Sequence, residues 1–169
     1  MGSDMSEELL KQFIEESIRL ERNVAELYKV FNRLFPEDAY FWWTMFEEEE
    51  NHAALIEHAA KIIVMSEDVL SQMLAPSLDA LKKTNLKILS LVSEYNANPP
   101  SREAAFNVAL KLELSAGELH FQKFMSRQNE DDIIAQLFQR LNKDDKDHAA
   151  RLLEYMAEHD IKTSQSINV

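Results

Sequence analysis

The feature that most constrains the fold is an internal repeat. The segment LERNVAELY, residues 20–28, aligns with LELSAGELH, residues 112–120, at an offset of 92. The segment ENHAALI, residues 50–56, aligns with KDHAARL, residues 146–152, at an offset of 96. Two helical hairpins of similar design, facing each other across a pseudo-twofold axis, would produce this pattern. Equivalent positions of the two halves should then converge.

Turn signals divide the chain into long helices. Only two glycines and four prolines occur in 169 residues, too few for the turns of an all-β fold. We expect main helices over residues 6–34, 37–64, 101–127 and 133–159, a short helical piece over 66–74, and a crossover helix from Pro76 to about residue 95. The predicted fold is therefore all-α, a four-helix bundle with a long crossover containing an extra helix between helices 2 and 3.

This interpretation gives one domain over residues 6–160. A chain of this length can bury about two-thirds of its unfolded surface in a single core. The opening MGSDM, residues 1–5, is interpreted as an expression scar with a disordered N-terminus, and residues 161–169 as a polar tail.

Composition excludes several classes of function. With 18 basic and 30 acidic residues the net charge is −12, which argues against nucleic-acid and anionic-membrane partners. The absence of cysteine excludes disulfides, thiolate catalysis, iron–sulfur clusters and cysteine-ligated zinc. Neither an apolar run long enough to span a membrane nor a secretory leader is evident, so a cytoplasmic location is expected by default.

Each main helix carries one acidic residue in the middle of an apolar stripe, as a rotation of about 100° per residue shows. These residues are Glu21, Glu49, Glu113 and Asp145. In the stretch FEEEENHAALIEH, residues 46–58, Glu49 faces inward, and the other three glutamates are expected on a solvated face. The alternative for Asp145 is a solvated KDDKD turn of helix.

Two of the four acidic residues are followed by a histidine three positions later, at His52 and His148. That spacing stacks a carboxylate and an imidazole about 4.5 Å apart on one helix face, so that both can bind one ion. Four buried carboxylates without a basic residue in their stripes would each cost several kcal/mol or take up protons. Two divalent cations would cancel the charge, and nitrogen and oxygen donors suit iron, manganese or zinc. The sequence therefore predicts a di-metal core.

The pattern of these residues resembles the di-iron ligand set of the ferritin-like superfamily and is most similar to that of rubrerythrins. The resemblance spans residues 6–159 and implies a ferritin-like bundle that binds two metal ions, with iron favoured over manganese or zinc. It implies that the glutamates of helices 1 and 3 are terminal ligands, that each histidine binds one ion, and that Glu49 and Asp145 bridge. The six implied ligands are Glu21, Glu49, His52, Glu113, Asp145 and His148.

Three features depart from the rubrerythrin pattern. Asp145 stands where the family has a glutamate and is one methylene shorter, which bears on its bridging role. Ala116 stands where rubrerythrins have a further glutamate linked to peroxide chemistry, and this weakens the peroxidase interpretation. No rubredoxin-like cysteine motif is present, so electrons would come from a separate donor.

The resulting hypothesis is a di-iron oxidase or peroxidase, an oxidoreductase whose reduced metal pair reacts with dioxygen or hydrogen peroxide. A homo-oligomer, such as a dimer, is expected. Tyr28 and His120 lie two turns after Glu21 and Glu113, where each could hydrogen-bond a ligand carboxylate. Tyr28 could also be an ordinary half-buried residue, and His120 a seventh ligand. The alternative functions are iron binding or sequestration without catalysis and a metal-free helical interaction module.

Overall fold

The structure, a computed structural model, describes residues 2–60, 70–119 and 133–164. This part of the chain forms five α-helices and one 3₁₀ turn and contains no strand, which confirms the all-α prediction. The elements are α1 (Gly2–Leu34), η1 (Pro36–Asp38), α2 (Ala39–Ala60), α3 (Leu70–Ala97), α4 (Arg102–Leu119) and α6 (Ile133–Glu158). Among the described residues, no helix is both long and apolar enough to cross a membrane.

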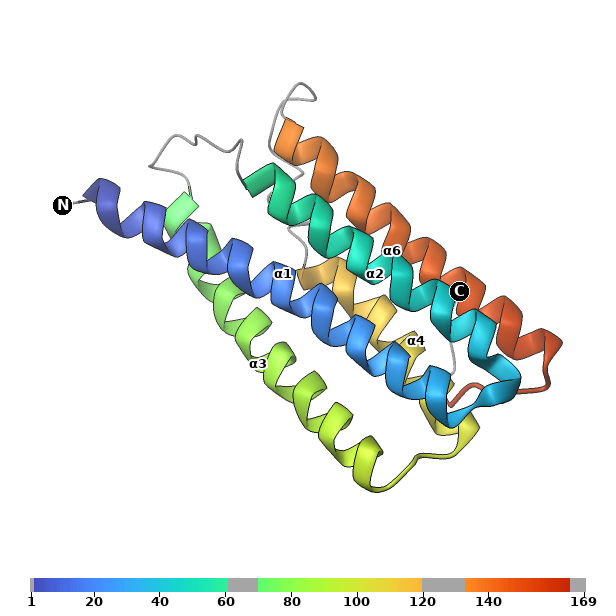
Figure 1. Cartoon of the computed structure of the whole chain (residues 1–169). Coiled ribbons are helices and arrows are strands. Elements are labelled where there is room, and N and C mark those ends of the chain that lie inside the picture. The colour runs from blue at the N-terminus through green and yellow to red at the C-terminus, as the bar shows by residue number, and fades with distance from the viewer. Residues whose placement is uncertain (1, 61–69, 120–132, 165–169) are drawn as a thin grey trace.

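The helices pack side by side into a bundle (Figure 1). α1 packs against α2 to form one hairpin, and α4 packs against α6 to form the second, as the repeat predicted. α2 and α6 contact each other and thereby join the two hairpins. α3 packs on the side of α1 away from α2, so it covers the first hairpin from outside (Figure 1).

A buried polar network fixes the crossover helix α3 on α1. Asn85 donates from Nδ2 to Glu16 Oε2 at 2.7 Å and to the Glu16 carbonyl at 3.0 Å. The Nδ2 of Asn23 donates to Asn85 Oδ1 at 3.0 Å. Because these groups are buried, any other register of α3 on α1 would leave them without partners.

Several helix boundaries differ from the sequence prediction. α1 begins at Gly2 rather than near Ser6. α3 runs unbroken through Pro76, where two separate pieces were predicted. A proline removes one helical hydrogen bond, and the packing of α3 on α1 offsets that loss. The predicted Ser101 cap is present, since its Oγ accepts a hydrogen bond from the Ala104 amide at 3.1 Å. The predicted ends at residues 64 and 127 lie outside the described residues.

An ion pair joins three elements at the end of the bundle where α1 turns into α2. Asp38 in η1 accepts hydrogen bonds from Arg102 Nε at 2.7 Å and Arg102 Nη2 at 2.6 Å. The Tyr155 hydroxyl donates to the same carboxylate at 2.8 Å. Since Arg102 opens α4 and Tyr155 lies in α6, this cluster sets the relative position of both hairpins.

We therefore expect Asp38→Ala to lower the free energy of unfolding by about 2 kcal/mol, because it leaves the partly exposed Arg102 and the Tyr155 hydroxyl without their acceptor. Urea denaturation monitored by circular dichroism measures the change. The control is Glu37→Ala at the neighbouring exposed position, which should change stability by less than about 0.5 kcal/mol. Equal losses in the two variants would contradict this role for Asp38.

Candidate metal centre

Five of the six predicted ligands come together between the helices. Glu21 comes from α1, Glu49 and His52 from α2, Glu113 from α4 and His148 from α6, and each is between 2% and 5% exposed. They form two groups, in each of which one ligand atom per residue lies within 4.8 Å of the others. One group contains Glu21, Glu49 and His52, and the other contains Glu49, Glu113 and His148.

Glu49 is shared because its two oxygens face different histidines. Its Oε2 lies 3.3 Å from His52 Nδ1, and Glu21 Oε2 lies 3.5 Å from the same nitrogen. Its Oε1 lies 2.9 Å from His148 Nδ1, and Glu113 Oε2 lies 3.4 Å from that nitrogen. The two imidazole rings stack with their centroids 5.4 Å apart and their planes 18° apart. The arrangement is approximately symmetric about the Glu49 carboxylate.

The donor atoms fit a cation better than they fit one another. Although Glu49 Oε1 and His148 Nδ1 are 2.9 Å apart and buried, neither makes a well-directed hydrogen bond with any described residue. Buried polar atoms left in this state cost free energy, which coordination of a shared ion would remove. Imidazole nitrogen and carboxylate oxygen are ligands that iron, manganese and zinc accept. The residues present therefore fit a pair of such ions.

The pKa values of the site residues also indicate that the cluster favours added positive charge. Burial, together with the negative charges of Glu113 and Glu21, raises the pKa of Glu49 to about 8. Burial acts to lower the pKa of each histidine, but the adjoining carboxylates outweigh it and raise the pKa of His52 to about 10 and of His148 to about 12. Without metal, protons on these side chains supply the positive charge that the cluster requires.

The hydroxyl of Tyr28 donates a hydrogen bond to Glu113 Oε1. Tyr28 lies in α1 and Glu113 in α4, so this bond crosses between the hairpins. Beside Tyr28 lies Trp42, with ring centroids 5.6 Å apart, and Trp42 in turn contacts Phe31 at 5.0 Å and Phe106 at 4.5 Å. All four aromatic side chains are fully buried, so they shield the site from solvent on the side of Tyr28.

Glu48 was expected on a solvated face, and that expectation is wrong. Its side chain is half-buried, and its Oε2 lies 3.0 Å from His148 Nε2. Arg151 donates from Nη1 to Glu48 Oε1 at 3.2 Å and from Nη2 to Glu48 Oε2. Burial acts to raise the pKa of Glu48, but the bonds from His148 and Arg151 lower it to about 2. The repeat offered a signal, since Glu48 lies 96 residues before Asp144, as Glu49 does before Asp145.

Two predicted residues are not placed by the structure. Asp145 lies on α6, but its side chain is not among those described, so its bridging role stays a prediction. His120 lies outside the described residues. The neighbouring Asp144, which sequence reasoning passed over, has its Oδ2 3.5 Å from His52 Nε2.

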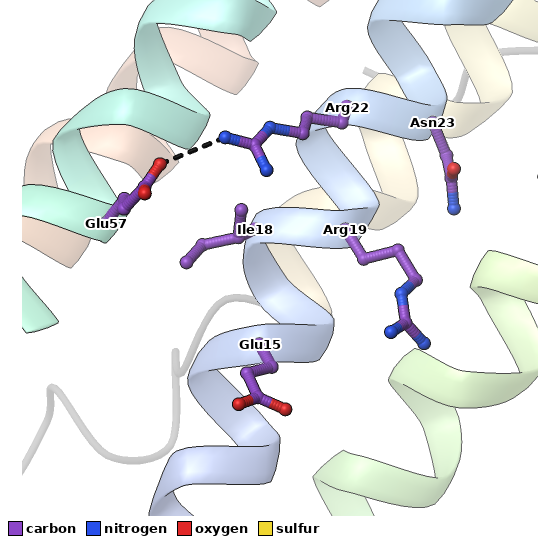
Figure 2. Close-up of a pocket in the computed structure, with 6 residues that line it drawn as sticks. All are labelled: Glu15, Ile18, Arg19, Arg22, Asn23 and Glu57. Carbon is purple, nitrogen blue, oxygen red and sulfur yellow. Dashed lines mark hydrogen bonds and ion pairs between the residues drawn. The ribbon is translucent and has the colours of Figure 1, made fainter.

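A groove beside α1 is separate from this centre (Figure 2). It is lined by Glu15, Ile18, Arg19, Arg22, Asn23 and Glu57. Across it, Arg22 Nη2 donates to Glu57 Oε2 at 2.9 Å, which ties α1 to α2. Arg19 is likewise paired, with Glu16 at 2.7 Å. Arg19, Arg22 and Glu57 thus have partners within the protein, and none of the candidate ligands lines the groove.

No protein-family model matches the chain, and neither the curated proteins nor the solved structures include one with a significant match to it.

The pKa values predict how stability depends on pH when metal is absent. Glu49 contributes stability that is fully present below its unfolded pKa of 4.5 and is lost as pH rises through about 8. His52 and His148 contribute stability present below 6.5 and lost as pH rises through about 10 and 12. With a chelator present, the free energy of unfolding should therefore fall steadily from pH 5 to pH 10. Urea titrations at each pH measure it.

The matched variant is Glu49→Gln, which lacks the titrating group and should show a shallower fall between pH 5 and pH 8. A wild-type stability that does not change over this range would contradict the assigned proton-bound state.

Proposed function

We propose that this chain is a ferritin-like di-metal carboxylate protein and an oxidoreductase of the rubrerythrin type, in which two iron ions react with dioxygen or hydrogen peroxide. The observation that carries the proposal is the shared Glu49 carboxylate, which faces the Nδ1 atoms of two histidines while each histidine has a further carboxylate of its own. This is the donor arrangement that a pair of adjacent ions requires.

The residues divide into two positions around Glu49. His52 and Glu21 would hold one ion, and His148 and Glu113 the other, with Glu49 between them. Asp145 would supply a second carboxylate, as the sequence resemblance implies. Because the pKa values of Glu49, His52 and His148 are raised, these groups would have to give up protons to act as ligands, so metal binding should release protons.

When bound, a redox-active metal pair supplies the electrons for the reaction. Reduction of hydrogen peroxide to two water molecules consumes two electrons and two protons, and a separate donor must return the electrons. The protein's own groups orient and insulate the centre: Tyr28 directs its hydroxyl proton at Glu113, and Trp42 and its aromatic neighbours exclude water.

The first test is metal stoichiometry. The full chain, freed of metal and titrated with Mn²⁺ or Fe²⁺ under anaerobic conditions, should bind two ions, a fixed number that argues against mineral storage. Glu49→Gln should weaken both steps by at least about tenfold, because it neutralises the carboxylate common to both positions. The control is Glu47→Gln at an exposed position of the same helix, which should leave both affinities unchanged. A wild-type chain that binds no ion would remove the proposal.

The second test is turnover. The protein loaded with Fe²⁺ should oxidise its iron on addition of hydrogen peroxide or dioxygen faster than the same iron in buffer, measured by stopped-flow absorbance. Glu49→Gln, which weakens both positions, should lose this acceleration. A wild-type rate equal to that of iron in buffer would leave metal binding without the proposed redox function.

A further inference from the structure

The repeat places a second pair of carboxylates around the centre, outside the ligand set. Glu48 and Asp144 are equivalent at the offset of 96, and each contacts the histidine of the opposite hairpin. Glu48 in α2 faces His148 in α6, and Asp144 in α6 faces His52 in α2. The contacts are reciprocal, and both are made to Nε2.

The two nitrogens of each imidazole ring have different neighbours. Nδ1 faces the shared glutamate, while Nε2 faces the oxygen of a second carboxylate, 3.0 Å away at His148 and 3.5 Å away at His52. A hydrogen bond from Nε2–H leaves the Nδ1 lone pair free for metal and fixes the plane of the ring. Glu48 and Asp144 are thus positioning residues for His148 and His52.

The two contacts are not equal. Glu48 Oε2 is 3.0 Å from His148 Nε2, and both oxygens of Glu48 accept hydrogen bonds from Arg151. Asp144 Oδ2 is 3.5 Å from His52 Nε2, and its basic neighbour Arg140 is 3.8 Å away. The side chain of Arg140 is 68% exposed, whereas that of Arg151 is 32% exposed.

Arg151 is itself held in place. Its Nη2 donates to the Met45 sulfur at 3.6 Å, and its Nε lies 3.3 Å from Asp147 Oδ2 as an ion pair without a well-directed hydrogen bond. A guanidinium that grips a carboxylate through two nitrogens restricts its rotation, whereas a single distant contact does not. On its Nε2 side, His148 therefore faces a carboxylate that is itself fixed, whereas the Nε2 contact of His52 is longer and its carboxylate is less constrained.

Building on the di-metal function proposed above, we propose that the two metal positions fill in a fixed order, with the His148 position first because the Glu48–Arg151 pair preorganises its imidazole. A preorganised ligand loses less conformational freedom on binding and so binds more tightly. At one equivalent of metal the chain then holds a single ion beside Glu113. It gains a metal pair only when supply is sufficient to fill the position at His52.

The test is a calorimetric titration of the full metal-free chain with Mn²⁺. The wild type should show two steps whose affinities differ by at least about tenfold. Glu48→Gln should weaken the first step by about 10- to 100-fold, the range seen when outer-shell partners of a metal ligand are lost. Asp144→Asn, the equivalent change in the other hairpin, should affect only the second step, and by less than about threefold since its contact is long.

A spectroscopic readout separates positioning from a general structural effect. In protein labelled with ¹⁵N-histidine and given one equivalent of Zn²⁺, the Nδ1 resonance of His148 should shift while that of His52 does not. Arg151→Lys, which keeps the charge but loses the two-nitrogen grip, should weaken the first step, so the proposal remains testable if Glu48→Gln does not fold.

The outcomes are distinguishable from those for the proposed function. Two ions bound with equal affinity, or first binding at His52, would overturn the order while leaving the di-metal function intact. Binding of no metal would instead overturn the di-metal function.

Discussion

The structure depends on how the negative charges of three buried glutamates, which lie between four helices, are neutralised. Glu21, Glu49 and Glu113 are buried there, and His52 and His148 are the basic groups that lie within 4 Å of them in the described ion pairs. An unpaired carboxylate in such a place costs several kcal/mol, so protons or metal ions must accompany it. Burial and the neighbouring carboxylates raise the pKa values of Glu49, His52 and His148, which favours protons on these groups when no cation is bound. Under the proposed function, metal and protons would compete for the same atoms, and this competition would link stability, pH and metal supply.

Contacts elsewhere in the fold fix the positions of the helices that carry these charged residues. The Asp38–Arg102 ion pair and Tyr155 join η1, α4 and α6 at one end, while Asn85 fixes the crossover helix on α1. Trp42 and its aromatic neighbours close the space next to the carboxylates, which keeps the local dielectric low and makes each charge contact stronger. The half-buried Glu48 links Arg151 to His148, because its carboxylate contacts the Arg151 guanidinium and the Nε2 atom of His148. The two hairpins contribute equivalent residues to the centre, but their unequal outer contacts make its halves chemically different.

Much of this could be predicted from the sequence because the signals are periodic. Helical stripes, the three-residue spacing of Glu49 and His52, and the repeat all depend on local geometry, so they predicted the all-α class, the two hairpins and the convergence of five residues. Glu48 was missed because a run of four glutamates offers equal candidates, and only the packing of α2 on α6 decides which of them meets Arg151. The predicted break at Pro76 was wrong for a related reason, since tertiary packing of α3 outweighs one lost hydrogen bond. Asp144 was missed because its contact with His52 depends on how α6 is rotated against α2, which the sequence does not specify.

The most direct test of charge neutralisation by metal is anomalous X-ray scattering from crystals of the protein loaded with iron or manganese. We expect two anomalous peaks inside the bundle, one among Glu21, Glu49 and His52 and the other among Glu49, Glu113 and His148. Carboxylate bridging would place them about 3.5–4 Å apart. Anomalous peaks confined to the acidic surface, with the buried carboxylates contacted only by protonated histidines, would contradict it.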